Sequence, residues 1–335
     1  MLVAFAALVA LVLMGVAAAA TIDLSAVGSA LQGADPDLMA LAVLMYAACQ
    51  TVSGLQWWVI QRAGGVEGLG AAHTLGLHWI SRGACEALPA SLGEGVRVAV
   101  VRRHPAGARA GTWRIVGALG GYKLVDGVVT SAAVLAIVML TPPPGPAGDV
   151  RWMALAALAI AAVAGIALWR GRLGGLRRRI PARVATAVGR MAEGGRGITE
   201  PSAARMATML SLMAVLLRIV SIAALLAALG LPVEAAALVY ALIVVSGLIP
   251  LAPGGAGTRE AVLIPALALA HGVPAASAMA LSVAIQAVSL GTSLALGGGA
   301  LAWLGPMLMR CPEASAEASD EAPALAAPAP AAEAA

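Results

Sequence analysis

The chain has 335 residues, of which 61% are hydrophobic and only 11% are charged. Soluble globular domains carry about 25% charged residues, so the composition excludes a soluble enzyme and predicts an integral membrane protein. The net charge of +4 fits basic loops at a membrane face, and no nucleic-acid-binding module is visible.

Apolar runs of about 20 residues, the length that crosses a bilayer, predict an all-α polytopic protein with about seven or eight transmembrane helices. The first run, residues 1–22, lacks the basic start of a secretory signal, and we interpret it as an uncleaved membrane helix. A last apolar stretch, residues 261–309, is too long for one span and is predicted to break at residues 271–274. The remaining runs begin at Leu38, Gly127, Trp152, Met206 and Ala235.

The distribution of Lys and Arg predicts the orientation, because basic loops are retained in the cytoplasm. Residues 170–205 form the most basic loop, whereas residues 141–149 carry no Lys or Arg. This bias places both termini in the cytoplasm of a cell-membrane protein. Residues 173–190 could form an amphipathic helix on an anionic lipid surface, or could serve only to fix the topology. We expect a membrane domain over residues 1–309 and a disordered Ala/Pro/Glu-rich tail over residues 310–335.

Two segments interrupt the apolar pattern with Pro, Gly and an acidic residue: residues 88–97, LPASLGEGVR, and residues 249–260, IPLAPGGAGTRE. The flanks of residues 66–103 are both predicted to be cytoplasmic, and those of residues 235–273 are both predicted to be external. Each segment is therefore predicted to be a re-entrant hairpin. Two interrupted hairpins from opposite sides indicate an inverted repeat with a binding site near the bilayer midplane.

A broken helix exposes backbone polar groups, and in hydrocarbon each unsatisfied group costs several kcal/mol, so the breaks must face protein or a watery cavity. Helices that restart there direct free N–H groups into the cavity, which suits an anion such as a phosphate. Glu94 could merely form a capping box with Ser91, and Glu260 could merely be a first-turn acid. Their occurrence in matched hairpins favours a functional role.

Three further charges lie in apolar surroundings. Arg218 is expected either to pair with Glu94, Glu260 or Asp126, or to bind a head-group phosphate. Lys123 and Asp126 are three residues apart near the predicted cytoplasmic end of their helix, and we expect them to pair locally.

The aromatic, cysteine and histidine residues give weaker indications. Trp57, Trp58 and Trp152 fall at predicted helix ends, where interface anchoring is expected. The cysteines lack CxxC spacing and the histidines are scattered, so neither a disulfide framework nor a metal site is predicted. No cofactor motif is visible.

The stretches PASLGEGVR at residues 89–97, YKLVDG at 122–127 and IPLAPGGAGTREA at 249–261 resemble the lysylphosphatidylglycerol synthase transmembrane domain family, which is flippase-like. Lys123 departs from the arginine that the family often shows there. In the bifunctional members this domain is joined to an aminoacyl transferase, which is not visible here, so a stand-alone translocase half is expected. Together with Arg218, the matched motifs predict a lipid head-group groove that comprises Glu94, Arg97, Asp126, Arg218, Pro253, Gly254, Gly255, Gly257, Arg259 and Glu260.

The resemblance implies a protein that moves a phospholipid or isoprenoid-type lipid between leaflets and is not an enzyme. Its expected partners are membrane lipids, an anionic lipid surface at the basic loop, and lipid-biosynthesis proteins. Two alternatives stay open: a non-catalytic subunit of a lipid-synthesis complex, and a membrane-embedded transferase acting on lipid-linked groups.

Overall fold

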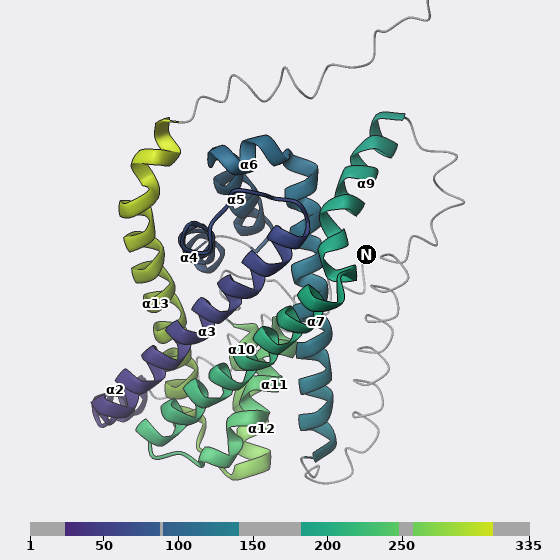
Figure 1. Cartoon of the computed structure of the whole chain (residues 1–335). Coiled ribbons are helices and arrows are strands. Elements are labelled where there is room, and N and C mark those ends of the chain that lie inside the picture. The colour runs from purple at the N-terminus through teal and green to yellow at the C-terminus, as the bar shows by residue number, and fades with distance from the viewer. Residues whose placement is uncertain (1–23, 88–89, 141–181, 248–256, 311–335) are drawn as a thin grey trace, which may run out of the picture.

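The computed structural model describes residues 24–87, 90–140, 182–247 and 257–310, and every regular element in these ranges is helical (Figure 1). Several predictions lie outside the described residues. They concern the helix at residues 1–22, the run from Trp152, the site residues Pro253, Gly254 and Gly255, and the tail after residue 310.

Four described helices are long and apolar enough to cross a membrane: α3 (Pro36–Ala63), α7 (Thr112–Leu140), α10 (Pro201–Ala228) and α13 (Ala275–Arg310). They confirm an all-α polytopic membrane protein. The predicted break between the last two apolar helices is also confirmed, because α12 ends at His271 and Gly272 follows with a left-handed backbone, φ 63°. Gly adopts this conformation without steric cost and commonly ends helices.

Two hairpins of shorter helices lie at opposite ends of the bundle (Figure 1). One consists of α4 (Ala71–Ala87) and α5 (Ala90–Arg103), and the other of α11 (Ala236–Ser246) and α12 (Thr258–His271). Each of these helices has 17 or fewer residues, which is below the roughly 20 residues of a spanning helix. The chain is interrupted between α4 and α5 and between α11 and α12 as predicted, although α5 already begins at Ala90, so Glu94 and Arg97 lie within this helix.

The packing repeats within the chain. The order of a long helix, a hairpin and a long helix describes both α3–α4–α5–α7 and α10–α11–α12–α13. The contacts match as well: α4 packs on α13 as α11 packs on α7, and α3 packs on α13 as α10 packs on α7. With the hairpins at opposite ends, this is the arrangement of the predicted inverted repeat (Figure 1).

The two halves meet along α3 and α10, which form the most extensive helix contact in the described chain. Both helices have 28 residues, and both start with Pro after an acidic residue. Pro suits the first turn, where its missing N–H needs no partner. Contacts between the helices recur every seven residues, as expected for a left-handed antiparallel pair: Asp35 N to Ala228 O at 3.0 Å, Ser221 Oγ to Ala42 O at 2.8 Å, and Cys49 Sγ to Ala214 O at 3.3 Å.

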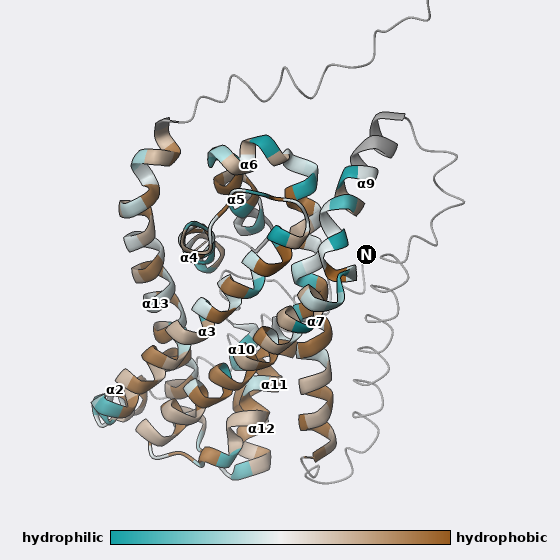
Figure 2. Ribbon diagram, viewed as in Figure 1, coloured by the Kyte–Doolittle hydropathy of each residue, from teal (hydrophilic) through white to brown (hydrophobic). Residues whose placement is uncertain are grey.

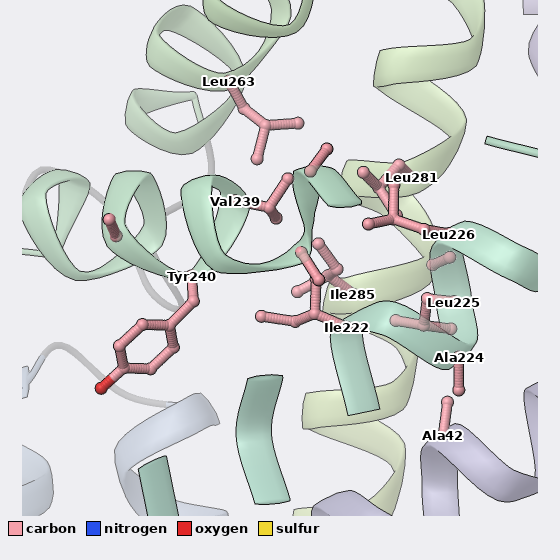
Figure 3. Packing of buried hydrophobic residues seen from close by; sticks show 14 of the residues in the cluster. Ala42, Ile222, Ala224, Leu225, Leu226, Val239, Tyr240, Leu263, Leu281 and Ile285 are labelled. Carbon is pink, nitrogen blue, oxygen red and sulfur yellow. The ribbon is translucent and has the colours of Figure 1, made fainter. Parts of the chain in front are cut away.

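An apolar core joins α10–α13 at the hairpin of the second half. Leu263 of α12 points toward Val239 of α11. On α13, Leu281 lies beside Leu226 of α10, and Ile285 lies beside Ile222 (Figure 3). Within a bilayer these side chains are held by close packing, because lipid tails are as apolar as the side chains and give no hydrophobic driving force. This core fixes α12, and hence the restart of the broken helix, against α13.

The two ends of the bundle differ in charge. One end, called the basic end below, carries Arg62, α6 (Pro105–Ala110), the start of α7 and α9 (Ala182–Gly195). Hydrophilic residues gather on α6 and α9, whereas α7, α10 and α11 are mostly hydrophobic (Figure 2). The opposite end carries Asp35, Asp37 and Glu234. The 3₁₀ helix η3 (Arg196–Thr199) links α9 to α10 at the basic end.

Two sequence-based expectations are corrected here. The spanning helix expected from Gly127 is α7, which already begins at Thr112, so Lys123 and Asp126 lie near its middle instead of at its end. Trp57 is 0% exposed and packs in the core around Ile60 and Leu77, so it is not an interface anchor. Periodicity in α3 did not show this, because the helix is apolar on all sides.

Candidate functional site

Arg97 on α5 is the most deeply buried cation of the described chain, with 1% of its side chain exposed. Its guanidinium lies between two aromatic rings, 5.3 Å from the ring centre of Trp57 and 5.6 Å from that of Tyr122. Its Nε donates to Ser81 Oγ at 3.2 Å. Stacking on the two rings and this hydrogen bond fix the orientation of the Arg97 guanidinium, which forms a planar fork of N–H donors. A desolvated cation over an aromatic face is stabilised by about 2 kcal/mol.

Glu94 stands between two cations. One carboxylate oxygen lies 2.6 Å from Lys123 Nζ, and the other lies 3.5 Å from Arg97 Nη1. The second separation is too long for a hydrogen bond, and Arg97 Nη1 has no hydrogen-bond partner among the described residues. Part of the Arg97 fork is therefore available to another acceptor. The predicted local pairing of Lys123 with Asp126 is wrong, because Lys123 reaches across to the hairpin instead.

A second ion pair lies one helix earlier, between Arg82 and Glu86 of α4. Arg82 Nη2 is 2.5 Å from Glu86 Oε1, and both side chains are mostly buried, 24% and 11% exposed. The sequence reasoning missed this pair. The available signal was an Arg and a Glu four residues apart in the apolar segment before the first hairpin break, a spacing that places them on one helix face.

Asp126 and Arg218 lie on the long helices that face each other across the site. Asp126 Oδ1 accepts a 3.2 Å hydrogen bond from Ser211 on α10. The Arg218 guanidinium lies 5.4 Å from the centre of the Tyr46 ring. In the described residues no carboxylate lies within 4.0 Å of Arg218, so the expected ion pair with Glu94, Glu260 or Asp126 is not formed there.

At the second hairpin, Gly257 precedes α12 with φ 83°, a backbone that other residues rarely adopt. Its N–H donates to Glu260 Oε2 at 2.6 Å, which confirms the capping role considered for Glu260. The other Glu260 oxygen accepts from Ser282 on α13 at 2.6 Å. The carboxylate thus both caps its helix and ties it to α13. Arg259 beside it is buried, with 6% exposed.

Electrostatic interactions connect these groups across the two halves. Glu94 interacts with Arg82, and Arg218 interacts with both Arg82 and Glu86. Arg259 in turn interacts with Glu260, Arg218 and Glu86. These side chains are together called the charged path below: Lys123, Glu94, Arg97, Arg82, Glu86, Arg218, Arg259 and Glu260, with Asp126 beside it. Ion pairs within 4.0 Å join Lys123 to Glu94, Glu94 to Arg97, and Arg82 to Glu86.

The charged path contains five cations and three carboxylates, and Asp126 beside it is a fourth carboxylate. Coulomb interactions are far stronger here than in water, because the surroundings have a low dielectric constant. A buried excess cation favours an anionic ligand. The described residues contain no group of three His, Cys, Asp or Glu side chains that could hold a metal ion.

Of the predicted groove residues, the structure brings Glu94 and Arg97 together on α5 and relates them through α4 to Arg218, Arg259 and Glu260. Asp126 lies on the neighbouring α7, bonded to α10. Besides the α4 pair, the sequence reasoning missed four partner residues: Tyr46, Ser81, Ser211 and Ser282. Hydroxyl groups in apolar helices are too common to be singled out without coordinates.

The fold and the charged path define a polytopic α-helical membrane protein with two short-helix hairpins at opposite ends and buried charge between them. The sequence profile of the lysylphosphatidylglycerol synthase TM region matches residues 2–297. The chain belongs to this family, whose function concerns membrane lipids. A search of curated proteins and a search of solved structures found no match.

Proposed function

We propose that the protein moves a lipid with a phosphate-bearing head group between the leaflets of a cell membrane. The charged path carries the head group, while the acyl chains stay in the surrounding lipid. The observation that supports this most directly is Arg97, a buried guanidinium held by two aromatic rings with one fork nitrogen unpaired by hydrogen bonds among the described residues.

The distances around Glu94 support an exchange in which a phosphate replaces Glu94 as the partner of Arg97 and Lys123. A phosphate oxygen accepts strong, charge-assisted hydrogen bonds from a guanidinium fork. An arriving head group competes with Glu94 for Arg97 and Lys123, since the carboxylate is 3.5 Å from the first and 2.6 Å from the second. As the head group leaves, Glu94 takes its place and the cations stay neutralised. Such exchange avoids leaving buried charge unpaired, which is costly.

The head group then passes along the cations of the path toward the second hairpin. Arg82, Arg218 and Arg259 interact electrostatically with one another or with Glu86, and they extend the path to α12. Glu260 lies at the α12 end of the path, where its carboxylate accepts hydrogen bonds from the N–H of Gly257 and from Ser282. The N-terminus of α12 adds its dipole, which favours an anion.

We place the basic end in the cytoplasm, with both chain termini on that side. The helix ends there carry Arg62, Arg102, Arg109 and Arg114, whereas the opposite end has acidic residues. Lys and Arg are retained on the cytoplasmic side. Membrane-impermeant thiol labelling of single cysteines, one in place of Arg102 and one in place of Asp37, tests this orientation in intact cells. Labelling at position 102 and protection at position 37 would refute it.

Reconstitution into liposomes tests the transport itself. Purified protein should speed the exchange of a fluorescent phosphatidylglycerol between leaflets, and Arg97→Lys should slow it at least tenfold, because Lys keeps the charge but lacks the fork. Arg102→Lys is a matched control, since Arg102 is exposed at the end of the same helix. Absence of exchange with any phosphate-bearing lipid would favour a subunit of a lipid-synthesis complex. Release of a chemically changed lipid would favour a transferase.

A further inference from the structure

A cavity of about 890 Å³ lies at the basic end of the bundle, separate from the charged path. Its wall combines the glycine-rich turn after α3, helix α6, the start of α7 and the junction of α9 with η3. The charged side chains that line it are Glu67, Arg109, Arg114, Glu193 and Arg196. Its volume lies within the range of about 300–1,000 Å³ typical of small-molecule sites.

The arginines of this cavity are not all neutralised by the protein. Arg114 Nη2 lies 3.2 Å from Glu193 Oε2. Arg109 and Arg196 are exposed, and neither lies within 4.0 Å of a carboxylate in the ranges that the structure describes. Their positive charge faces the cavity with only Glu67 as a further carboxylate in its lining.

In the turn after α3, three glycines leave most of one wall free of side chains, with Glu67 between them. Gly65 and Gly68 both have φ 79°, a conformation that disfavours any residue with a Cβ. A Cβ on Gly68 would lie 3.4 Å from Arg109 Nη2, and one on Gly64 would lie 2.3 Å from the carbonyl oxygen of Gly194. The glycines therefore let the turn approach both α6 and α9 while the arginine fork stays accessible.

Tryptophans place the cavity at the level of lipid head groups. Trp58 Nε1 donates to Leu69 O at 3.2 Å, just past the glycine turn, and Arg62 lies 5.7 Å from the Trp58 ring centre. Trp113, beside Arg114, is 41% exposed. Tryptophan is enriched at the membrane interface, and basic pockets between helices at that depth bind anionic head groups.

We propose that this cavity binds the phosphate group of an anionic ligand, through Arg109 and Arg196. The phosphate belongs either to a lipid of the adjacent leaflet or to a soluble phosphate ester. The site is distinct from the charged path and does not depend on lipid movement through it.

The test measures binding to the purified full chain in zwitterionic nanodiscs. One arm adds phosphatidylglycerol to the nanodisc and counts bound lipid by native mass spectrometry. The other arm titrates glycerol 3-phosphate and inorganic phosphate in solution. Binding in either arm is expected, and the arm identifies the source. No binding in both arms would overturn the proposal.

Variants assign the binding to the cavity. The double variant Arg109→Gln with Arg196→Gln should weaken it roughly thirtyfold, given the usual contribution of each basic residue near a membrane surface. The double variant Arg102→Gln with Arg205→Gln is the matched control. Both arginines are exposed at the basic end but do not line the cavity, and their replacement removes the same two positive charges. Equal losses in the two double variants would overturn the proposal.

A third variant, Glu67→Gln, is expected to strengthen phosphate binding, and misfolding could not produce this result. Glu67 is exposed and lines the cavity, and its removal relieves repulsion of the phosphate. Binding should become about fivefold tighter. Weaker or unchanged binding in this variant would contradict the proposed site.

Discussion

The ammonium group of Lys123 lies 2.6 Å from the carboxylate of Glu94 and joins the middle of α7 to the first hairpin. Through Glu94 the contact extends to Arg97, so a residue on a spanning helix neutralises a carboxylate on a short one. Removing either partner of a buried pair leaves the other uncompensated. This pair is partly accessible, with Lys123 48% and Glu94 30% exposed, so its contribution to stability is small and its contribution to ligand exchange dominates.

Lys123→Gln should reduce lipid exchange in liposomes at least tenfold and change stability little. The loss of exchange follows because Glu94 is then free to pair with Arg97 and to exclude a phosphate. The effect on unfolding should be roughly 0–1 kcal/mol, as for accessible ion pairs. Leaflet exchange and thermal unfolding in detergent measure the two effects. A large fall in melting temperature with unchanged exchange would show that the pair is structural.

Two substitutions of Glu260 separate the effect of its capping hydrogen bond from the effect of its charge. Gln at this position can still accept from the Gly257 N–H, since Gln also serves in capping boxes. Glu260→Gln should therefore keep the stability and abolish lipid exchange. Glu260→Ala should also lose stability, by about 0.5–2 kcal/mol, because the cap is lost. If Glu260→Gln exchanges lipid at the normal rate, the charge of Glu260 has no part in transport.

The contact of α7 with α9 depends on Gly117. A Cβ there would lie 2.0 Å from the carbonyl oxygen of Met191, a backbone atom that cannot move away easily. Gly117→Ala should destabilise the fold by about 1–3 kcal/mol, as overpacking does. Gly120→Ala on the same helix is the control, since no atom lies within 4 Å of its Cβ position. That change should be neutral or slightly stabilising, and equal melting temperatures for the two variants would contradict the contact.

Stability should depend on pH through His104, between α5 and α6. Its Nδ1 accepts from the N–H of Ala106 at 3.2 Å, and its Nε2 lies 3.1 Å from Nδ1 of His73. Burial lowers the pKa of His104 below its ordinary value of 6.5, and the nearby His73 and Arg109 lower it further. The folded state favours the neutral ring, so this contribution is complete above pH 6.5 and is lost as the pH falls below it.

His104→Asn should flatten this pH dependence while it keeps the cap, because Asn is a good N-terminal capping residue that does not titrate. Melting temperatures measured from neutral to mildly acidic pH provide the check. If the variant and the natural chain lose stability in parallel as the pH falls, another group is responsible.

Much of the site could be located from the sequence, because charge in a strongly apolar chain is conspicuous. The two Pro/Gly segments, with Glu94, Arg97, Arg259 and Glu260, stood out for this reason. Arg82 and Glu86 did not stand out, because they lie in a short segment before the break that contains no Pro. The partner of Lys123 could not be predicted, because it is decided by where α7 meets α5 and not by spacing along α7.

The sequence by itself determined that the chain is an all-α membrane protein, that its last apolar stretch breaks after His271, and that two interrupted segments carry Glu94, Arg97, Arg259 and Glu260. These properties follow from composition and from Pro and Gly, which act locally. Only the tertiary structure decided which charges pair, that Trp57 is a core residue stacked on Arg97, and that α3 and α10 pack in register. Such pairings depend on contacts between distant segments, and helices that are apolar on every side give no indication of which face meets which neighbour.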